Sequence, residues 1–326
     1  MIKLDISNQI KLNEDVIKKL LSVYDVKYQS YKLIKFGIEN ISAFISTKEG
    51  KFVLRVYRNN NKKLSDIKLE LEFMAFLRKN GVKTPKIIGN HHKQSLSRKK
   101  IDNKFWNYIL MEFVDGAHLK YNQINLISSL AKAQAIIHKH TSKFKIISKD
   151  YHNFRNRLNS FVSEYKTNKP FIYNKYGEEL TIETIEEVVH DLKKNLDALQ
   201  KLPSGLVHLD YHGSNILVKD NKINGIIDFD DLSFSPFVAD LANSLLWWTY
   251  LNQTKNIQKI KEKYLLEYQK YRKLSRNELA LVALLMRWRN VSVGLNLENF
   301  KRMTKKDWQR ITNFDLLLKN DIDFKD

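Results

Sequence analysis

Residues 206–242 read LVHLDYHGSNILVKDNKINGIIDFDDLSFSPFVADLA, and this stretch decides the expected fold. Its first half carries Asp210 and Asn215, five residues apart, between two short apolar runs. A second aspartate, Asp228, directly follows the apolar segment Gly225–Ile227. Short apolar runs bounded by turn residues are typical of buried strands. We therefore expect a loop that carries Asp210 and Asn215, followed by a strand that ends at Asp228.

These three side chains match the chemical needs of phosphoryl transfer from ATP. A carboxylate within hydrogen-bond reach of an attacking hydroxyl aligns it and accepts its proton, and we assign this role of catalytic base to Asp210. Mg²⁺ prefers hard oxygen ligands, which the Asn215 amide and the Asp228 carboxylate provide. A single Asp or Asn is more often a solvated turn residue, but three beside apolar strands favour the functional interpretation.

His208 and His212 flank the candidate base at alternate positions, a pattern that resembles a metal-ligand triplet. No further cluster of His or Glu at metal spacing accompanies them in the sequence, so a zinc site is not expected. We expect a structural His208 that hydrogen-bonds near Asp228. For His212, a place near the phosphates and the absence of any role are both open.

The composition is that of a folded protein with a large core. The 326 residues are 43% hydrophobic, enough for two lobes. The absence of cysteine excludes disulfides and Cys-based zinc sites and fits a reducing compartment. The N-terminus lacks the apolar core of a signal peptide, and the longest apolar run, Leu279–Met286, is too short to span a bilayer. We therefore expect a cytoplasmic protein without a membrane partner.

The chain is strongly basic, with 56 Lys and Arg against 36 acidic residues and a net charge of +20. Such an excess attracts anions, among them ATP and nucleic acids. However, the densest basic groups are short and far apart in the sequence: Lys62-Lys63, Arg98–Lys100 and Lys305-Lys306. We interpret the charge as lysines spread over solvated surfaces and do not expect a nucleic-acid partner. The oligomeric state is open.

Residues 1–113 are expected to form a small, β-rich, nucleotide-binding N-lobe with one inserted helix. Strand patterns occupy residues 32–36, 43–47, 52–57, 86–88 and 105–113. A hairpin turn is expected at 48–51, and a helix at 65–80 that Gly81 ends.

Residues 114–326 are expected to form a larger, helical, catalytic and substrate-binding C-lobe. Helical patterns cover 125–140, 181–201 and almost everything after 239. The fold class is therefore α+β and bilobal, with ATP expected in the cleft between the lobes.

Arg55 is a lone basic residue in the apolar strand pattern, and its burial is costly unless it is paired. We expect it to contact the α- and β-phosphates of ATP, held by a glutamate of the helix. Glu70 shares a helical face with apolar residues, whereas Glu72 shares a face with lysines, so we choose Glu70. The alternative is an outward-facing Arg55 on a half-exposed sheet.

Two further stretches are candidates for nucleotide contacts. Gly37 and Asn40 belong to the link between the first two strands, whose backbone would cover the phosphates. At the end of the N-lobe, the backbone of Glu112 and Val114 would hydrogen-bond adenine, with Met111 at the back of the pocket. A plain core strand would have the same sequence pattern.

Together these motifs resemble the aminoglycoside phosphotransferase and choline-kinase-like family of small-molecule kinases, over about residues 25–250. The family patterns H-G-D-x-H-x-x-N, I-D-F-[GDE]-[DE] and D-P-x-x-D-L-A correspond to His208–Asn215, Ile227–Asp231 and Ser235–Ala242. The resemblance implies a protein-kinase-like fold with ATP and Mg²⁺. It also implies these roles: base for Asp210, magnesium ligands for Asn215 and Asp228, phosphate contacts for Arg55 and Glu70, and a loop-bracing role for Asp240.

Three residues at or beside the candidate site differ from those most common in the family. Leu209 replaces the glycine of H-G-D, and Asp230 stands where many members have glycine. Arg55 stands where lysine is more common, but its planar fork also binds phosphate. None of these changes removes a catalytic group, so we expect an active enzyme.

The acceptor is expected to be a hydroxyl group of a small molecule. A protein kinase has a glycine-rich loop and a long activation segment, whereas here Pro236 follows Asp228 by only eight residues. The expected acceptor is therefore a metabolite such as homoserine, choline or a sugar, or an antibiotic. Two alternatives stay open: a resistance kinase specific for aminoglycosides or macrolides, and a non-catalytic ATP-binding protein with this fold. The aromatic residues of the last helices either line the acceptor pocket or pack the core.

Overall fold

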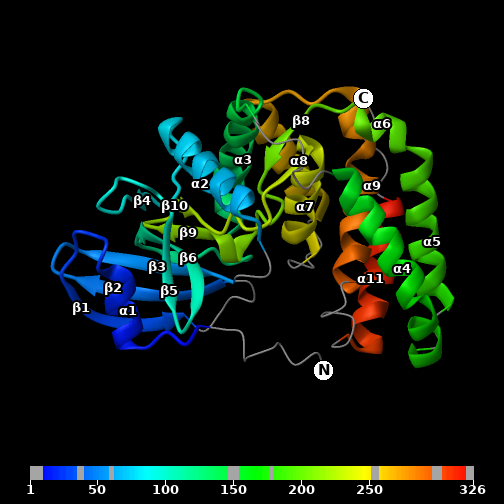
Figure 1. Ribbon diagram of the computed structural model, residues 1–326. Coiled ribbons are helices and arrows are strands. Elements are labelled where there is room, and N and C mark those ends of the chain that lie inside the picture. The colour runs from blue at the N-terminus through cyan, green and yellow to red at the C-terminus, as the bar shows by residue number, and fades with distance from the viewer. Residues whose placement is uncertain are drawn as a thin grey trace. The chain divides into compact units, whose positions relative to one another are not determined.

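A computed structural model describes residues 10–34, 40–58, 62–145, 154–176, 179–250, 257–295 and 303–320 (Figure 1). The chain divides into two compact units. The first contains Met1–Ala117, Leu217–Asp220 and Asn224–Asp230, and the second contains His118–Ile216, Asn221–Ile223 and Asp231–Asp326. This division differs from contiguous lobes of residues 1–113 and 114–326, because two short later segments join the first unit.

The first unit contains a six-stranded antiparallel sheet. Its strands are β1 (Tyr28–Ile34), β2 (Asn40–Thr47), β3 (Lys51–Tyr57), β4 (Ile87–Ile88), β5 (Ser97–Ile101) and β6 (Lys104–Glu112). The order is β1-β2-β3-β6-β4, and β5 pairs with β6. The hairpin predicted at 48–51 is confirmed: the Thr47 N–H donates to the Gly50 carbonyl at 2.9 Å, and β2 pairs with β3.

Two helices cover opposite faces of this sheet. Helix α1 (Glu14–Leu21) contributes Ile17 to a buried cluster that includes Leu54 of β3, and α2 (Leu64–Lys79) contributes Ile67 to one that includes Tyr57. Leu54 and Tyr57 are an odd number of positions apart on one strand, so their side chains point to opposite faces. The sequence predicted α2 but neither α1 nor β5.

Helix α2 ends where the sequence predicted. The Gly81 N–H donates to the Arg78 carbonyl, and the Val82 N–H donates to the Leu77 carbonyl, each at 3.0 Å, which closes the helix end. Gly81 has a φ of +81°, a conformation that glycine adopts at little cost. A Cβ at this position would meet nothing within 4 Å, so the backbone angle and not the available space favours glycine here.

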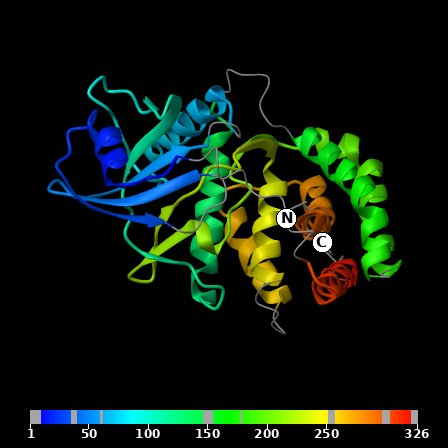
Figure 2. The same cartoon turned by 60° about the horizontal axis from the view of Figure 1, so that its bottom comes forward.

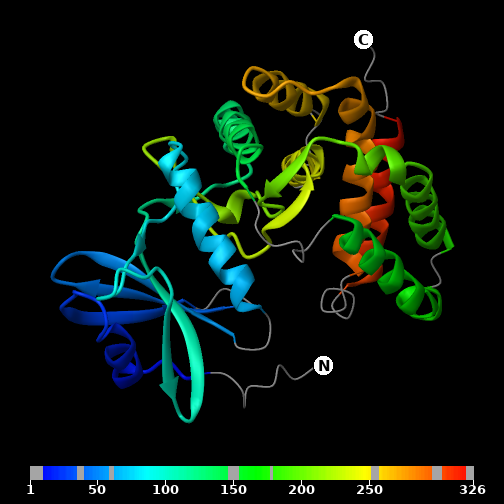
Figure 3. The ribbon, with the colours of Figure 1, turned by 45° about the horizontal axis from the view of Figure 1, so that its top comes forward.

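Two small sheets carry the loops of interest. One has the order β10-β9-β7, from β7 (Ala117–His118), β9 (Ile216–Lys219) and β10 (Lys222–Ile226), and the other is the antiparallel pair of β8 (Ser204–Val207) and β11 (Ser233–Pro236) (Figure 3). Residues 208–215 connect β8 to β9, and a short 3-10 helix, η3 (Gly213–Asn215), ends this connection. Residues 227–232 connect β10 to β11. Asp210 and Asn215 therefore lie between β8 and β9, and Asp228 lies two residues after β10.

The rest of the second unit is helical. Its elements are η2 (Ile124–Leu126), α3 (Ile127–Thr141), α4 (Phe154–Tyr176), α5 (Glu179–Lys194), α6 (Leu196–Gln200), α7 (Phe237–Tyr250), α8 (Ile257–Gln269), α9 (Arg276–Leu295) and α11 (Lys305–Asn320). Helices α4, α5, α9 and α11 pack side by side (Figures 1 and 2). Helix α8 packs against α3 and α7, both of which are seen nearly end-on in Figure 3. The helix predicted at 181–201 is two helices, with a break at Asn195.

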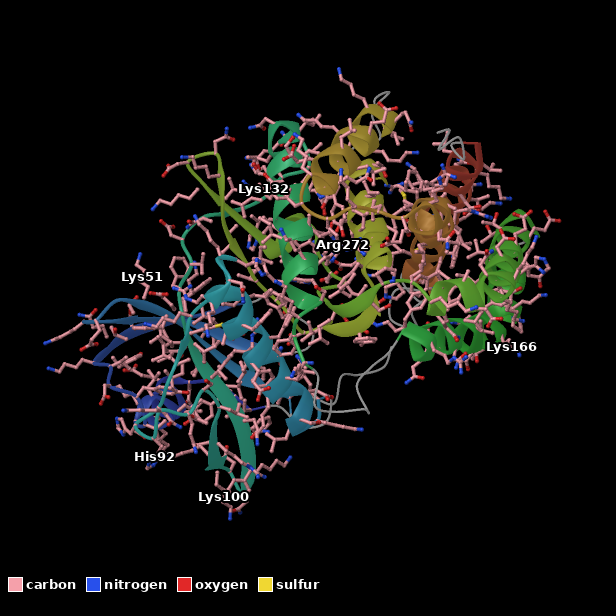
Figure 4. All side chains as sticks on the ribbon, turned by 90° about the horizontal axis from the view of Figure 1, so that it is seen from above. Lys51, His92, Lys100, Lys132, Lys166 and Arg272 are labelled. Carbon is pink, nitrogen blue, oxygen red and sulfur yellow. The ribbon has the colours of Figure 1, made fainter. Side chains whose placement is uncertain are left out.

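Exposed basic side chains are distributed over separate elements. Figure 4 labels Lys51 of β3 and Lys100 of β5 in the first unit, and Lys132 of α3 and Lys166 of α4 in the second, and all four are exposed. Arg272, also labelled, is instead paired with Glu278 at 2.7 Å. Within the described ranges, no helix has the length and apolarity needed to cross a membrane.

Candidate active site

Helix α7 holds the loop that carries Asp210. The preceding residue, Leu209, has a φ of +55°, a left-handed conformation that a leucine rarely adopts. Its N–H donates to Asp240 Oδ1 at 2.6 Å, and its carbonyl accepts a hydrogen bond from Asn243 Nδ2. Asp240 and Asn243 both belong to α7, so this helix holds the peptide groups before and after Leu209. This is the loop-bracing role that was predicted for Asp240.

Asp240 is itself the centre of a buried polar network. Its Oδ2 lies 2.9 Å from His138 Nε2 and 2.8 Å from Gln134 Nε2, and His138 Nδ1 lies 2.6 Å from the Tyr268 hydroxyl. Burial raises the pKa of Asp240, but the hydrogen bonds from His138 and Gln134 and the electrostatic effect of the two histidines, His138 and His208, outweigh burial and lower the pKa overall. Burial lowers the pKa of His138 despite the nearby carboxylate. A neutral His138 therefore donates from Nε2 to an ionised Asp240 and accepts from Tyr268.

The Asp210 carboxylate is held by two neighbours. Asn215 Nδ2 donates to Asp210 Oδ2 at 2.8 Å, and His212 Nε2 lies 3.1 Å from the same oxygen. Burial raises the pKa of Asp210, but the hydrogen bond and charge of His212, with the charges of His208 and Arg289, lower it overall. Asp210 is therefore ionised at neutral pH. Because the Asn215 amide nitrogen faces Asp210, its amide oxygen points away from that carboxylate.

Asp228 lies just after β10, where the sequence predicted it. Its φ is +63°, a conformation that Asp tolerates better than most residues, and its side chain is 43% exposed. The next residue, Phe229, is fully buried and packs edge-on against Phe73 of α2, with ring centroids 6.1 Å apart. This contact fixes the backbone beside Asp228. The Asp228 carboxylate lies 3.6 Å from Arg55 Nη2.

Arg55 and Glu70 lie together in the first unit. Arg55 Nη1 donates to Glu70 Oε1 at 3.3 Å, and the Glu70 side chain is 0% exposed. Glu72 is exposed at the surface of α2. The helical face chosen from the sequence is therefore the face that meets Arg55.

Lys62 and Asp230 complete this charged cluster, and the sequence did not predict either contact. Lys62 Nζ lies 2.5 Å from Glu70 Oε2 and 3.2 Å from Asp230 Oδ1, and Asp230 Oδ1 lies 3.5 Å from Arg55 Nη1. Asn40 Nδ2 also donates to Asp230. The interpretation of Lys62-Lys63 as a solvated pair was wrong for Lys62, whose side chain is only 15% exposed. The sequence held one signal for the contact of Lys62, namely Asp230, the second aspartate of Ile227–Asp231, because a carboxylate there needs a cation as its partner.

The cluster contains more negative than positive charge. Burial lowers the pKa of Arg55, but the charges of Asp230, Asp228 and Glu70 raise it overall. Burial likewise lowers the pKa of Lys62, and Glu70 and Asp230 reverse the shift. Two cations face three carboxylates, so the fully ionised cluster carries one net negative charge. Such a cluster is suited to a further cation.

The candidate adenine contacts lie at the end of β6. Met111 is buried against α2, and the Glu112 N–H donates to the Lys86 carbonyl at 2.8 Å. A backbone contact of Glu112 with adenine would therefore use its carbonyl oxygen. Val114 packs closely against Gly225, because a Cβ added to Gly225 would lie 2.6 Å from Val114 Cγ1. Gly37 lies outside the described residues.

Fold and site together define a kinase-like phosphotransferase. The model of the phosphotransferase enzyme family matches residues 30–274, well over half of the chain, so the protein belongs to this family. A homoserine kinase from Nitrobacter hamburgensis is 25% identical over 283 residues, which cover 84% of this chain and 80% of the relative.

Solved structures show the same fold. Amicoumacin kinase hAmiN, in complex with AMP-PNP, Ca²⁺ and Ami, gives a TM-score of 0.71 at 14% identity and covers 95% of this chain and 94% of its own. Choline kinase from Cryptosporidium parvum Iowa II gives a TM-score of 0.65 at 16% identity, with 95% and 96% covered. The predicted protein-kinase-like fold is confirmed. The chain is an ATP-dependent small-molecule kinase with a hydroxyl acceptor.

Proposed function

We propose that this kinase transfers the γ-phosphate of ATP to the hydroxyl group of a small amino acid, with homoserine as the first candidate. The single observation that supports the chemistry best is the environment of Asp210. Its carboxylate is ionised, is oriented by Asn215 and His212, and lies in a loop that α7 braces. A cytoplasmic location, expected from the sequence, goes with this proposal.

Asp210 would act as the base for the acceptor hydroxyl. In phosphoryl transfer the protein mainly positions groups and neutralises charge, and proton transfer to the base comes late. An ionised carboxylate with a lowered pKa is a good hydrogen-bond acceptor for the hydroxyl and a weak base, which suits late proton transfer. His212 would keep the Asp210 carboxylate in one orientation.

Asn215 and Asp228 would hold Mg²⁺ through one amide oxygen and one carboxylate. Among the described residues, no group of three or more His, Cys, Asp or Glu side chains is placed to hold a metal ion by itself. Two oxygen ligands still fit Mg²⁺, because this ion usually keeps several waters and takes its remaining ligands from substrate phosphates. When bound, Mg²⁺ would neutralise negative charge on the transferred phosphate.

Arg55 would bind the ATP phosphates, and Glu70 would hold its guanidinium in place. The contact between them at 3.3 Å supports this pairing. Lys62 shares Glu70 with Arg55, so it would add a second positive charge to the same place. Asn40 would support this group through Asp230, and Gly37 would contribute backbone over the phosphates. Adenine would contact the Glu112 carbonyl, the Val114 N–H and the Met111 side chain.

Homoserine is proposed as the acceptor because the matched relative is a homoserine kinase. The matched homoserine kinase aligns with 84% of this chain, which includes the segments of both Asp210 and Asp228. The same chemistry would serve other small alcohols, such as choline or a sugar. The decisive measurement is an ATP-consumption assay over a panel of hydroxylated metabolites and antibiotics.

The role of Asp210 is tested by Asp210→Ala. We expect kcat to fall by about two to four decades while ATP binding persists, because a positioned proton acceptor is lost. The matched control is Asp197→Ala, which removes an exposed aspartate of the same unit and should leave kcat unchanged. Turnover within a few-fold of wild type in Asp210→Ala would show that another group is the base.

The metal role is tested by Asp228→Ala. Loss of this carboxylate should weaken ATP binding in the presence of Mg²⁺ by about tenfold or more, since one charged ligand is removed. Without a divalent cation, the affinity for ATP should not fall. Calorimetric titration of ATP with and without Mg²⁺ measures both values, and an unchanged Mg²⁺ dependence would refute the role.

A further inference from the structure

Arg289 of α9 is a cation next to the candidate base that the proposed phosphoryl transfer does not use. Its Nε donates to Asn243 Oδ1 at 2.8 Å, and Asn243 in turn donates to the carbonyl of Leu209, which precedes Asp210. Within the part of the chain that the structure describes, the guanidinium makes no other hydrogen bond or ion pair. Nε therefore links Arg289 to the catalytic loop through Asn243 of α7, and the two terminal nitrogens remain for a ligand.

The surroundings of Arg289 supply too little negative charge. Burial lowers the pKa of Arg289 and Arg157 lowers it further, and the charges of Asp231, Asp210 and Asp240 offset this only in part. At Arg55 the balance is the opposite, because the nearby carboxylates outweigh burial and raise the pKa overall. A half-buried guanidinium whose charge is poorly compensated favours an anionic ligand, since such a ligand restores the missing partner.

An ion pair between α4 and the segment after β10 acts electrostatically on Arg289. Arg157 of α4 donates from Nη2 to the Asp231 carbonyl at 3.2 Å and to Asp231 Oδ1 at 3.3 Å. Apart from Asp240, whose oxygens are taken by its own hydrogen bonds, the groups that act on the pKa of Arg289 are Arg157, Asp231 and Asp210, so these four charged groups lie within electrostatic range of one another. All four belong to the second unit. Two cations and two carboxylates together are suited to a ligand that carries both charges.

We propose that Arg289 binds the carboxylate of the acceptor, that Asp231 binds its ammonium group, and that the acceptor is therefore a zwitterionic hydroxy amino acid. The planar fork of arginine matches a carboxylate with two parallel hydrogen bonds. Asp231 is 44% exposed at its side chain, and Arg157 holds it by Oδ1 and the main chain, which leaves Oδ2 for the ammonium group. This assignment rests on the proposed function, because it requires Asp210 to receive the hydroxyl.

The experiment compares two alcohols that differ only in the carboxylate. Homoserine and 3-aminopropan-1-ol have the same hydroxyl and amine, but the second lacks the carboxylate. Wild-type kcat/KM should be at least 100-fold higher for homoserine, because a polar site left unpaired is costly. Arg289→Met should lower kcat/KM for homoserine by about 100-fold and that for 3-aminopropan-1-ol far less, through Asp210 and Asn243 only, and should leave the KM for ATP unchanged.

Two further variants show whether the effect of Arg289→Met comes from the lost carboxylate contact or from misfolding. Arg289→Lys keeps the charge without the fork and should retain part of the preference for homoserine. Arg276→Met removes an exposed arginine from the same helix and should behave as wild type. Thermal denaturation of each variant shows whether it is folded, and the wild-type comparison of the two alcohols needs no variant.

The outcomes separate this inference from the proposed function. If wild type phosphorylates 3-aminopropan-1-ol as well as homoserine, or if Arg289→Met reduces both equally, the carboxylate site is refuted while the kinase activity stands. If wild type phosphorylates neither alcohol nor any other hydroxy amino acid, the proposed acceptor class fails and the carboxylate site fails with it. Asp231→Asn should reduce turnover of homoserine but not of 4-hydroxybutanoate, which lacks the amine; equal loss on both would refute the ammonium contact.

Discussion

Leu209 shows how one residue departs from the family pattern without loss of the loop. The family places glycine before the catalytic aspartate, and here a leucine adopts a φ of +55°. A left-handed conformation costs a non-glycine residue about 1–2 kcal/mol. The leucine side chain is buried against Val207 and Phe237, and burial of a leucine is worth about 2–5 kcal/mol. Packing therefore outweighs backbone strain at this position.

This balance predicts an inverted order of stability for two variants. Leu209→Ala loses the packing and keeps the strain, whereas Leu209→Gly loses the packing and relieves the strain. Leu209→Gly should therefore be about 1 kcal/mol more stable than Leu209→Ala by denaturant unfolding. At Leu206, a buried residue of β8 without a positive φ, the alanine variant should be the more stable of the two by about 0.5–1 kcal/mol. The same order at both positions would contradict the strain at Leu209.

Residues with local signals were predictable, and those whose contacts depend on the fold were not. Asp210, Asn215 and Asp228 lie beside apolar strands, and the choice of Glu70 over Glu72 follows from helical spacing. The role of Lys62 does not follow from its neighbours, because its contact with Asp230 joins residues 168 positions apart. Arg289 lies in an arginine- and tryptophan-rich stretch that gives no sign of which arginine is already paired. The structure shows that Arg287 is the paired one, with Asp315 at 3.0 Å.

At the scale of elements, α7 is the support of the loop that carries Asp210. Asp240 accepts three hydrogen bonds, from the Leu209 N–H, His138 and Gln134. Asp240→Asn would place an amide N–H against one of these donors. We expect a loss of about 2–4 kcal/mol in unfolding free energy and a fall in kcat of tenfold or more. Asp197→Asn, at the surface of α6, is the control and should change neither; an Asp240→Asn enzyme with wild-type kcat would show that the loop does not need this brace.

His138 of α3 makes the same network sensitive to pH. Burial lowers its pKa below the usual 6.5, so the unfolded chain takes up a proton that the folded chain does not as the pH falls below about 6.5. The contribution of neutral His138 to stability is therefore full above pH 6.5 and decreases from there towards the folded pKa. Thermal midpoints at pH 7.5 and 5.5 should differ more for wild type than for His138→Gln. Equal differences would rule out His138 as a source of the pH dependence.

Element prediction succeeded where periodicity was unbroken. The alternation of β2 and β3 and the glycine stop of α2 were visible in the sequence. Helix α1 has only eight residues, too few for a clear period, although Asn13 caps its first turn by accepting from the Val16 N–H. The apolar stripe of residues 181–201 continues across Asn195, so periodicity alone could not show the break between α5 and α6.

For the whole molecule, the charge of +20 predicts weak and salt-sensitive contact with nucleic acids. The lysines labelled in Figure 4 stand on separate elements, and no long basic tract is present in the sequence. Fluorescence anisotropy with a short DNA or RNA duplex should give a Kd of about 10⁻⁶ M or weaker at physiological salt, as for non-specific binding. Nanomolar binding at that salt would instead indicate a dedicated nucleic-acid surface.

The first unit includes two segments from late in the chain, Leu217–Asp220 and Asn224–Asp230, and this limits where the chain can be divided. Residues 224–230 carry Phe229, which fills the space beside Phe73, and Asp230, which neutralises Lys62. A fragment that stops at Ala117 would expose a hole in its core and leave Arg55 and Lys62 with only Glu70 to neutralise them. The first unit is therefore not a continuous segment that recombination could transfer in one piece. A recombination event between relatives that keeps this unit intact must transfer residues 1–117 together with residues 217–220 and 224–230.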